Sequence, residues 1–133
     1  MDRLIRNDID WNAVKDTFKN ATPFNHVAID DFFLPEVAEQ ISKEFPVYNN
    51  PELGFYNNAI ENKKVFNSWD KFPKLTYKVF TYLGRDFFLN KMKSLIDSDD
   101  LWMDYGLNGG GYHMHGRGGK NNVHLDYNIH PKL

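Results

Sequence analysis

The residues best suited to chemistry lie near the end of the chain, between Gly106 and Leu133. This stretch holds four of the five histidines and seven of the nine glycines. Within it, His124 and Asp126 belong to a segment in which apolar and polar residues alternate from Val123 to Ile129, a pattern typical of a half-buried strand. Side chains two positions apart on a strand share a face and lie roughly 6.6 Å apart at the backbone. This imidazole and carboxylate can therefore bind one metal ion or hydrogen-bond to each other.

A turn and a second strand are expected to position this pair. Tyr112 to His115 reads as a short strand, and the glycine-rich segment from Gly116 to Lys120 is interpreted as the connection of a hairpin, because glycine accepts positive φ without steric cost. A solvent-facing hairpin would also carry a polar residue at every second position. That reading, in which His124 and Asp126 only face water, stays open at this point.

The stretch from Tyr112 to Asp126, with its glycine-rich turn and its His-x-Asp pattern, resembles the metal-binding segment of the 2-oxoglutarate- and Fe(II)-dependent oxygenases of the prolyl 4-hydroxylase type. The segment from Ile29 to Val37, read as a strand that runs into a helix begun by Pro35, is similar to the opening segment of that family. These two segments are a minor part of the chain, and the helices between them are compatible with the family without being specific to it.

The resemblance implies a double-stranded β-helix, or jelly roll, in which two histidines and one carboxylate hold Fe(II) and leave positions open for 2-oxoglutarate and O2. His124 and Asp126 match the first two metal ligands. Some members of the family place a tyrosine that touches the co-substrate ten residues before the first ligand. Met114 occupies that position here and Tyr112 lies two residues earlier, so both are candidate co-substrate contacts. The implied function is that of a hydroxylating dioxygenase.

The chain departs from this family pattern after Asp126. The second metal-binding histidine and the basic residue that binds the far carboxylate of 2-oxoglutarate come several strands later in the family. His130 cannot replace that histidine, because it lies roughly 13 Å from Asp126 and roughly 20 Å from His124 along a straight strand. We therefore expect the front part of an oxygenase-like domain, incomplete at its C-terminal side, that is inactive as an isolated fragment.

The remaining pattern predicts an α+β fold in a single domain over residues 1–133, with N-terminal helices packed on the opening strands of the jelly roll. Apolar residues at helical spacing predict helices over Asp8–Asn20, Leu34–Phe45 and Phe72–Ile96, the last with a break at Gly84. Strands are predicted at Phe24–Ile29 and Leu101–Leu107, and Pro46–Asp70 is interpreted as a loop, either a substrate-side loop or an ordinary surface connection.

The composition excludes several classes of function. Sixteen Lys and Arg residues against eighteen Asp and Glu residues give no electrostatic reason to expect nucleic acid or a membrane surface as a partner. No cysteine is present, which excludes disulfides and thiol catalysis. Without a signal peptide or a long apolar run, we expect a cytoplasmic protein that acts on a small molecule or a peptide and that associates with itself through exposed strand edges.

Two rival hypotheses use the same residues. His113, His115 and His124 could form a zinc site if the hairpin brought both polar faces together. A cupin-type site is less well supported, because it needs a glutamate soon after its histidines and the last glutamate in the chain is Glu61. The alternative from another class is a non-enzymatic metal-binding or protein-interaction module.

Overall fold

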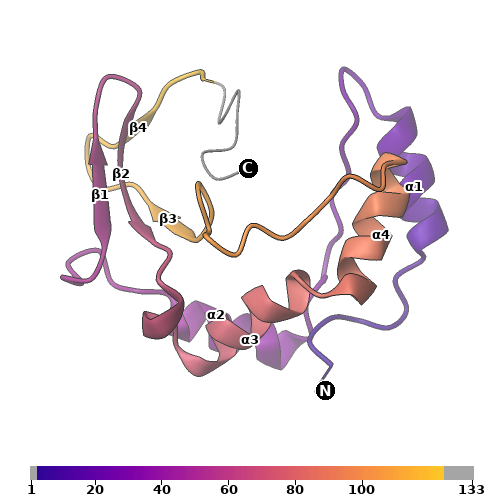
Figure 1. Ribbon diagram of the computed structural model, residues 1–133, viewed down its shortest axis with the longest axis horizontal. Helices are drawn as coiled ribbons and strands as arrows, with labels where there is room; N and C mark the ends of the chain where they lie inside the picture. The colour runs from indigo at the N-terminus through magenta and orange to yellow at the C-terminus, as the bar shows by residue number, and fades with distance from the viewer. Residues whose placement is uncertain (1–2, 125–133) are drawn as a thin grey trace. The chain divides into compact units, whose positions relative to one another are not determined.

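The computed structural model of the protein describes residues 3–124. This part of the chain is α+β, which confirms the predicted fold class at that level (Figure 1). The four helices are α1 (Trp11–Asn20), α2 (Pro35–Glu44), α3 (Lys74–Leu83) and α4 (Asp86–Ile96). The antiparallel sheet contains β1 (Gly54–Asn57), β2 (Glu61–Phe66), β3 (Tyr112–Met114) and β4 (Lys120–Asn121), and a short 3-10 helix, η1, spans Trp69–Lys71.

Two compact units make up the chain. Unit 1 consists of Met1–Glu44 and Pro73–Asp104, and unit 2 consists of Phe45–Phe72 and Tyr105–Leu133. The four helices belong to unit 1 and the sheet belongs to unit 2. The expectation of one domain over the whole chain stays a prediction.

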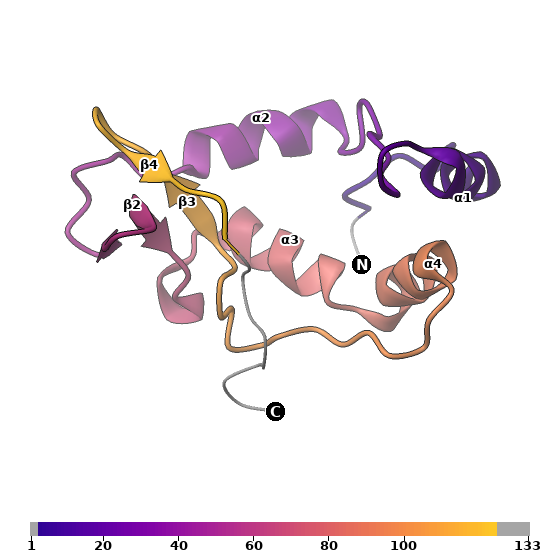
Figure 2. The same ribbon diagram turned by 90° about the horizontal axis from the view of Figure 1, so that it is seen from above.

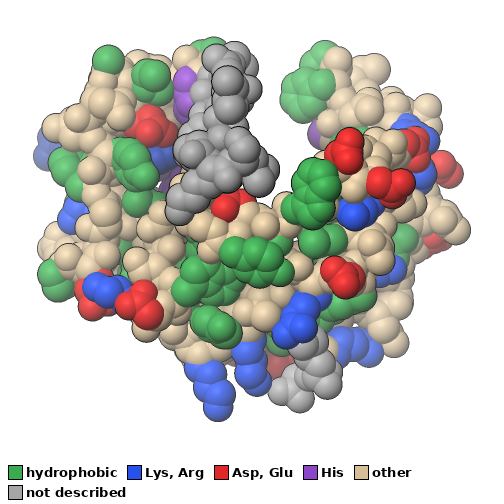
Figure 3. All heavy atoms as spheres, viewed as in Figure 1, with side chains coloured by type: hydrophobic (Ala, Val, Ile, Leu, Met, Phe, Trp, Pro, Cys, Tyr) green, Lys and Arg blue, Asp and Glu red, His purple; other side chains and the backbone are tan. Residues whose placement is uncertain are grey.

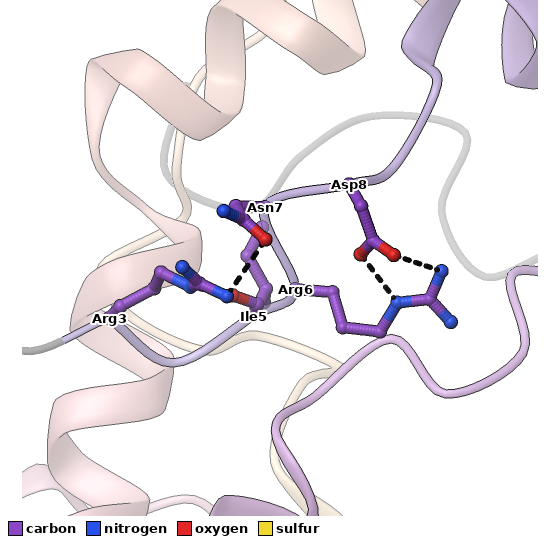
Figure 4. Close-up of polar contacts among 5 residues, drawn as sticks. All are labelled: Arg3, Ile5, Arg6, Asn7 and Asp8. Carbon is purple, nitrogen blue, oxygen red and sulfur yellow. Dashed lines mark hydrogen bonds and ion pairs between the residues drawn. The ribbon is translucent and has the colours of Figure 1, made fainter.

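Asp10 sets the beginning of α1 in unit 1. Its Oδ1 atom accepts hydrogen bonds from the backbone N–H groups of Asn12 and Ala13, at 3.0 and 3.1 Å, which satisfies two of the donors that a helix leaves open at its N-terminus. The helix predicted over residues 8–20 is thus confirmed except for its first residues. Asp8 does not cap it, because its carboxylate pairs with the Arg6 guanidinium, and this pairing lowers the pKa of Asp8 (Figure 4).

The core of unit 1 is apolar and is built from helix faces and the N-terminal segment. α2 packs against α3 and α1 packs against α4 (Figure 2). Ile5 pairs with Phe33 in an isolated antiparallel bridge, which brings the N-terminal segment against the start of α2. The buried residues of this core are Leu4, Ile5, Val37, Val79 and Tyr82.

Glu44, the last residue of α2, stabilises the beginning of α3. Its carboxylate accepts hydrogen bonds from the backbone N–H and the hydroxyl of Thr76, at 2.7 and 2.8 Å, and from the Leu75 N–H at 3.3 Å. Burial alone would raise the pKa of Glu44, but the hydrogen bonds from Thr76, Gln40 and Leu75 outweigh it and lower the pKa. The helix predicted over residues 34–45 is confirmed, and its last residue caps the next helix.

Gly84 separates α3 from α4, as the sequence predicted. A side chain at this position would collide with Met103, since a β-carbon added to Gly84 would fall 2.8 Å from the Met103 Cγ atom. α4 ends at Asp97, which adopts a left-handed conformation with φ of 51°. The Asp97 carboxylate pairs with Lys15 and Lys19 of α1, and these two ammonium groups lower the pKa of Asp97 to about 2.

Two strand predictions are wrong, one for a segment within unit 1 and one for a segment that crosses from unit 1 into unit 2 along the sequence. Residues 24–29 have no regular structure, because the described part of the chain offers no strand beside them and strand formation depends on a partner. Residues 101–107 are likewise irregular. Leu107 has a φ of 48°, which is incompatible with an extended strand.

The third correction concerns residues 46–70, which were interpreted as a loop. They contain β1, β2 and η1, and β2 is the strand to which all the others pair. The turn between β1 and β2 is held by the Asn58 side chain, whose Oδ1 atom accepts hydrogen bonds from the N–H groups of Ile60 and Glu61, both at 2.8 Å. Turn residues at Asn49–Pro51 and Tyr56–Asn58 and aromatics without a regular period had indicated a loop here.

One face of this sheet is apolar. Phe66 contacts Phe72 edge to face at 5.4 Å between ring centres, and Tyr112 lies 4.8 Å from the ring of Phe45. Val65 and Phe66 are both buried, so β2 uses its C-terminal end as the anchor of unit 2. Burial of such aromatic side chains is the dominant source of stability for so small a sheet.

The glycine-rich segment after β3 is not a hairpin connection. β3 and β4 do not pair with each other; both pair with the same edge of β2, one after the other (Figure 1). Met114 lies opposite Lys64 and Lys120 lies opposite Asn62, so residues 115–119 form an excursion opposite the single residue Lys63. Gly119 is required there, because a β-carbon would come within 2.9 Å of the Gly116 carbonyl oxygen.

The surface carries several large apolar side chains, and Figure 3 shows hydrophobic groups on one face of the molecule. Trp102, Tyr105, Phe24 and Val47 are among the most exposed. Within residues 3–124, none of the helices has the length and apolar character needed to cross a membrane.

Candidate functional site

The second face of the unit 2 sheet is polar and borders a cavity of about 510 Å³. Alternation along β2 places Glu61, Lys63 and Val65 on this face, and all three line the cavity. Tyr56 lies opposite Lys63 in the register of β1, and His113 lies opposite Val65 in the register of β3. The sheet therefore separates an aromatic face, which stabilises unit 2, from a face that carries titratable groups.

A loop forms another wall of this cavity. Asn108, Gly109 and Gly110 line it, and the Leu107 carbonyl accepts a hydrogen bond from the Gly110 N–H at 3.0 Å. The loop joins β3 through Gly111, which has a φ of 104° and whose added β-carbon would fall 2.5 Å from the Phe66 carbonyl oxygen. Only glycine fits this approach, so part of the glycine run that stands out in the sequence serves to hold the loop against β2.

His124 lines the same cavity, and its ring is oriented by the backbone. The Nδ1 atom lies 2.5 Å from the Asn122 carbonyl oxygen; since a carbonyl only accepts, Nδ1 carries the proton and the basic lone pair of the neutral ring is on Nε2. Asn122 is itself fixed, because its N–H donates to Ile60 O at 2.9 Å and its side-chain amide donates to Ala59 O at 3.1 Å.

Glu61 links His124 to a buried lysine. Its Oε1 atom lies 2.5 Å from the Lys63 ammonium and 3.9 Å from His124 Nε2. The pKa of Glu61 is lowered, first by the hydrogen bond from Lys63 and then, against the opposing effect of burial, by the charges of Lys63, His124 and His113. Glu61 is thus an anion at neutral pH, held between the Lys63 ammonium and the His124 imidazole.

One feature of His124, the contact of its Nδ1 with a backbone carbonyl, is typical of a metal ligand. Histidines that bind metals almost always donate their other ring N–H to a carbonyl or carboxylate, which fixes the tautomer and the ring orientation. His124 has this arrangement and presents Nε2 on the cavity side with Glu61 nearby. His26 in unit 1 makes the same local contact with Phe24 O at 2.9 Å but is exposed, whereas His124 is half-buried and lines the cavity.

The other predicted site residues have different positions. Asp126 lies outside the described residues. Tyr112 packs on the aromatic face against Phe45, and Met114 is buried two residues further along the same strand. Neither lines the cavity, whereas His113 between them does.

The structure does not assemble the predicted zinc site. His113 lines the cavity, but His115 is exposed at the start of the excursion. Across residues 3–124, no group of three or more His, Asp or Glu side chains is arranged to hold a metal ion. His113, His115 and His124 are therefore not ligands of one metal in this arrangement.

Glu61 and Lys63, the two charged residues at the centre of the polar face, were not predicted from the sequence. A signal was present: Glu61, Lys63 and Val65 alternate with Asn62, Lys64 and Phe66 directly after the turn signal at Asn57 and Asn58. Lysine is almost never buried without a partner. A strand with charged residues on both faces was therefore not recognised as the central strand of the sheet.

Comparisons with protein-family models, with curated proteins and with solved structures find no match to this chain. A function is therefore inferred from the cavity and from the motif that lies beside it.

Proposed function

We propose that the chain forms the front part of a 2-oxoglutarate- and Fe(II)-dependent dioxygenase domain, with His124 as a metal ligand on the cavity side of unit 2 and Asp126 as its partner. In this proposal the sheet of unit 2 supplies opening strands of a double-stranded β-helix. The observation that supports it is the placement of His124, which lines the cavity, has its Nδ1 2.5 Å from Asn122 O and has its Nε2 3.9 Å from Glu61.

The residues of this chain would have three tasks in such a site. The Asn122 carbonyl holds the His124 ring in the tautomer that can bind a metal. The sheet face and the loop from Leu107 to Gly111 form the walls that orient a substrate. Glu61 places a carboxylate oxygen 3.9 Å from His124 Nε2, and the Lys63 ammonium balances its charge. The metal and 2-oxoglutarate, when bound, supply the oxidising chemistry that no side chain can supply.

Anaerobic titration with Fe(II), or with Co(II) as a spectroscopic substitute, tests the metal site. We expect binding of one equivalent by the unaltered chain and a loss of affinity of about tenfold or more in His124→Ala and in Asp126→Ala, since removal of a ligand weakens a site with few ligands strongly.

His26→Ala is the matched control, because His26 makes the same contact with the carbonyl two residues before it but lies in unit 1. Equal Co(II) affinity in the unaltered chain, His26→Ala and His124→Ala would refute the assignment. Binding that depends on His124 and Asp126 without conversion of 2-oxoglutarate would favour the alternative, a non-enzymatic metal-binding module.

A further inference from the structure

Lys63 is a buried lysine at the centre of the polar sheet face. It is 8% exposed, and its ammonium lies 2.5 Å from Glu61 Oε1 and 5.8 Å from the centre of the Tyr56 ring. An ammonium group has three N–H donors. In the described part of the chain, one carboxylate oxygen and one aromatic face are the groups that meet them, while the side chain borders the cavity.

The charge of Lys63 is paired with Glu61 but is costly to bury. Burial of an ion pair costs desolvation energy that its attraction rarely repays, so apolar residues of similar size usually stabilise as well or better. The neighbouring positions on β2 show that alternative, since Val65 continues the same face with an apolar side chain and is buried. A buried lysine that borders an open cavity is therefore better explained by a ligand than by the stability of the sheet.

The cavity restricts the kind of ligand. Lys63 is the single Lys or Arg among the described residues that line the cavity. Asn58, Asn67 and Asn121 also line the cavity, and their side-chain amides supply hydrogen-bond donors and acceptors. The Lys63 ammonium and His124 Nε2 both lie near the same Glu61 oxygen, at 2.5 and 3.9 Å, so they are at most about 6.4 Å apart. A small molecule can span this distance.

We infer that the substrate is a small carboxylic acid whose carboxylate is bound by Lys63, with the asparagine amides contacting its remaining polar groups. This inference rests on the proposed function and deepens it by naming a substrate class. The co-substrate 2-oxoglutarate also carries carboxylates, so it is a second possible source of the carboxylate that Lys63 binds. A suitable choice of ligands separates the two.

The test compares acids with their amides, using ligand-observed NMR and calorimetry on the full chain with and without Co(II). The pairs are succinate with succinamide, L-glutamate with L-glutamine, and 2-oxoglutarate with 2-oxoglutaramate. We expect the acid to bind more tightly than the amide in at least one pair. We also expect Lys63→Met to weaken that acid about tenfold or more, the loss expected for a charge-assisted hydrogen bond.

Lys71→Met is the matched control, because Lys71 also pairs with a glutamate of unit 2, Glu52 at 3.2 Å, but is exposed. Lys63→Arg should retain most of the preference for the acid, since it keeps the charge. If Lys63→Met fails to fold because Glu61 is left unpaired, the double variant Glu61→Gln/Lys63→Met removes both charges and takes its place.

Dependence of succinate or glutamate binding on Lys63 supports the substrate assignment. Dependence confined to 2-oxoglutarate supports a carboxylate site and assigns it to the co-substrate. Amides that bind as well as acids, or acids that bind equally to the unaltered chain and to Lys63→Met, would overturn the inference. Carboxylate binding that persists in His124→Ala while Co(II) binding is lost, or the reverse, keeps the failure of the proposed function separate from the failure of this inference.

Discussion

Units 1 and 2 use their buried polar groups in opposite ways. In unit 1, Glu44 accepts hydrogen bonds from the open N–H groups at the beginning of α3 and from Thr76, which is fully buried. In unit 2, Lys63 and Glu61 pair with each other and face a cavity. The first arrangement is explained by the backbone that it satisfies. The second pairs two side chains with each other at the border of a cavity and satisfies no helix end.

The two units also bury apolar surface differently. Unit 1 gathers it between helix faces, in a core that includes Val37 and Val79. Unit 2 gathers most of its aromatic contacts on one side of a small sheet, around Phe66 and Phe72, with Val65 buried on the other side. A sheet that depends on one face for stability leaves its other face available for polar groups, which is the condition that a binding site needs.

The largest expected effect breaks the apolar side of unit 2. Phe66→Ala should lower the free energy of unfolding by about 3 to 5 kcal/mol, because it removes a buried aromatic ring and leaves a cavity. Urea denaturation measures this loss. Phe55→Ala, on the exposed strand β1, is the control and should cost less than about 1 kcal/mol. Similar losses in the two variants would contradict the assignment of this stability to the buried C-terminal end of β2.

A medium effect sharpens the structural use of polar groups in unit 1. Glu44→Ala should destabilise the protein by about 2 kcal/mol, since three donors at the beginning of α3 lose their acceptor. Glu39→Ala removes an exposed pair with Lys43 on the same helix and should cost less than about 0.5 kcal/mol. Thermal unfolding of both variants checks the difference, and equal melting temperatures would argue against the cap.

The smallest effect concerns Asp97, which joins α1 to α4 through exposed charges. Its pKa is lowered to about 2, so its contribution to stability is present above the ordinary pKa of an aspartate and is lost as the pH falls toward about 2. Asp97→Asn should therefore lower the melting temperature slightly near neutral pH, and the difference from the unaltered protein should shrink between about pH 5 and about pH 2. A difference that stays constant over this range would exclude the ion pairs as its cause.

The helices were the most predictable part of the fold. Apolar residues at helical spacing and the position of Pro35 indicated α2 almost to the residue, and Gly84 indicated the division between α3 and α4. These signals are local, because a helix satisfies its hydrogen bonds within its own segment. The residue that caps α1 depends on tertiary contacts, since Asn7 and Asp8 offer the same chemistry as Asp10 but bind Arg3 and Arg6 instead.

The sheet was much less predictable. β3 was expected, but β2 was interpreted as part of a loop because turn residues and irregularly spaced aromatics surround it. The pairing of β3 and β4 with one strand depends on contacts distant in sequence. For the site, the motif identified His124, which does line the cavity, whereas Glu61 and Lys63 emerged only when β2 placed them beside it. Asp126 stays a prediction.

The excursion at residues 115–119 has a consequence for variation in its length. From Met114 to Lys120 the chain takes six steps while β2 takes two, from Lys64 to Asn62, so the insertion adds an even number of residues. Side chains on a strand change sides at each step, so His113 and Asn121 lie on the same side because their partners, Val65 and Glu61, are four residues apart on β2. The excursion itself is not a strand, so its length can vary without altering the cavity wall as long as β3 and β4 keep these partners.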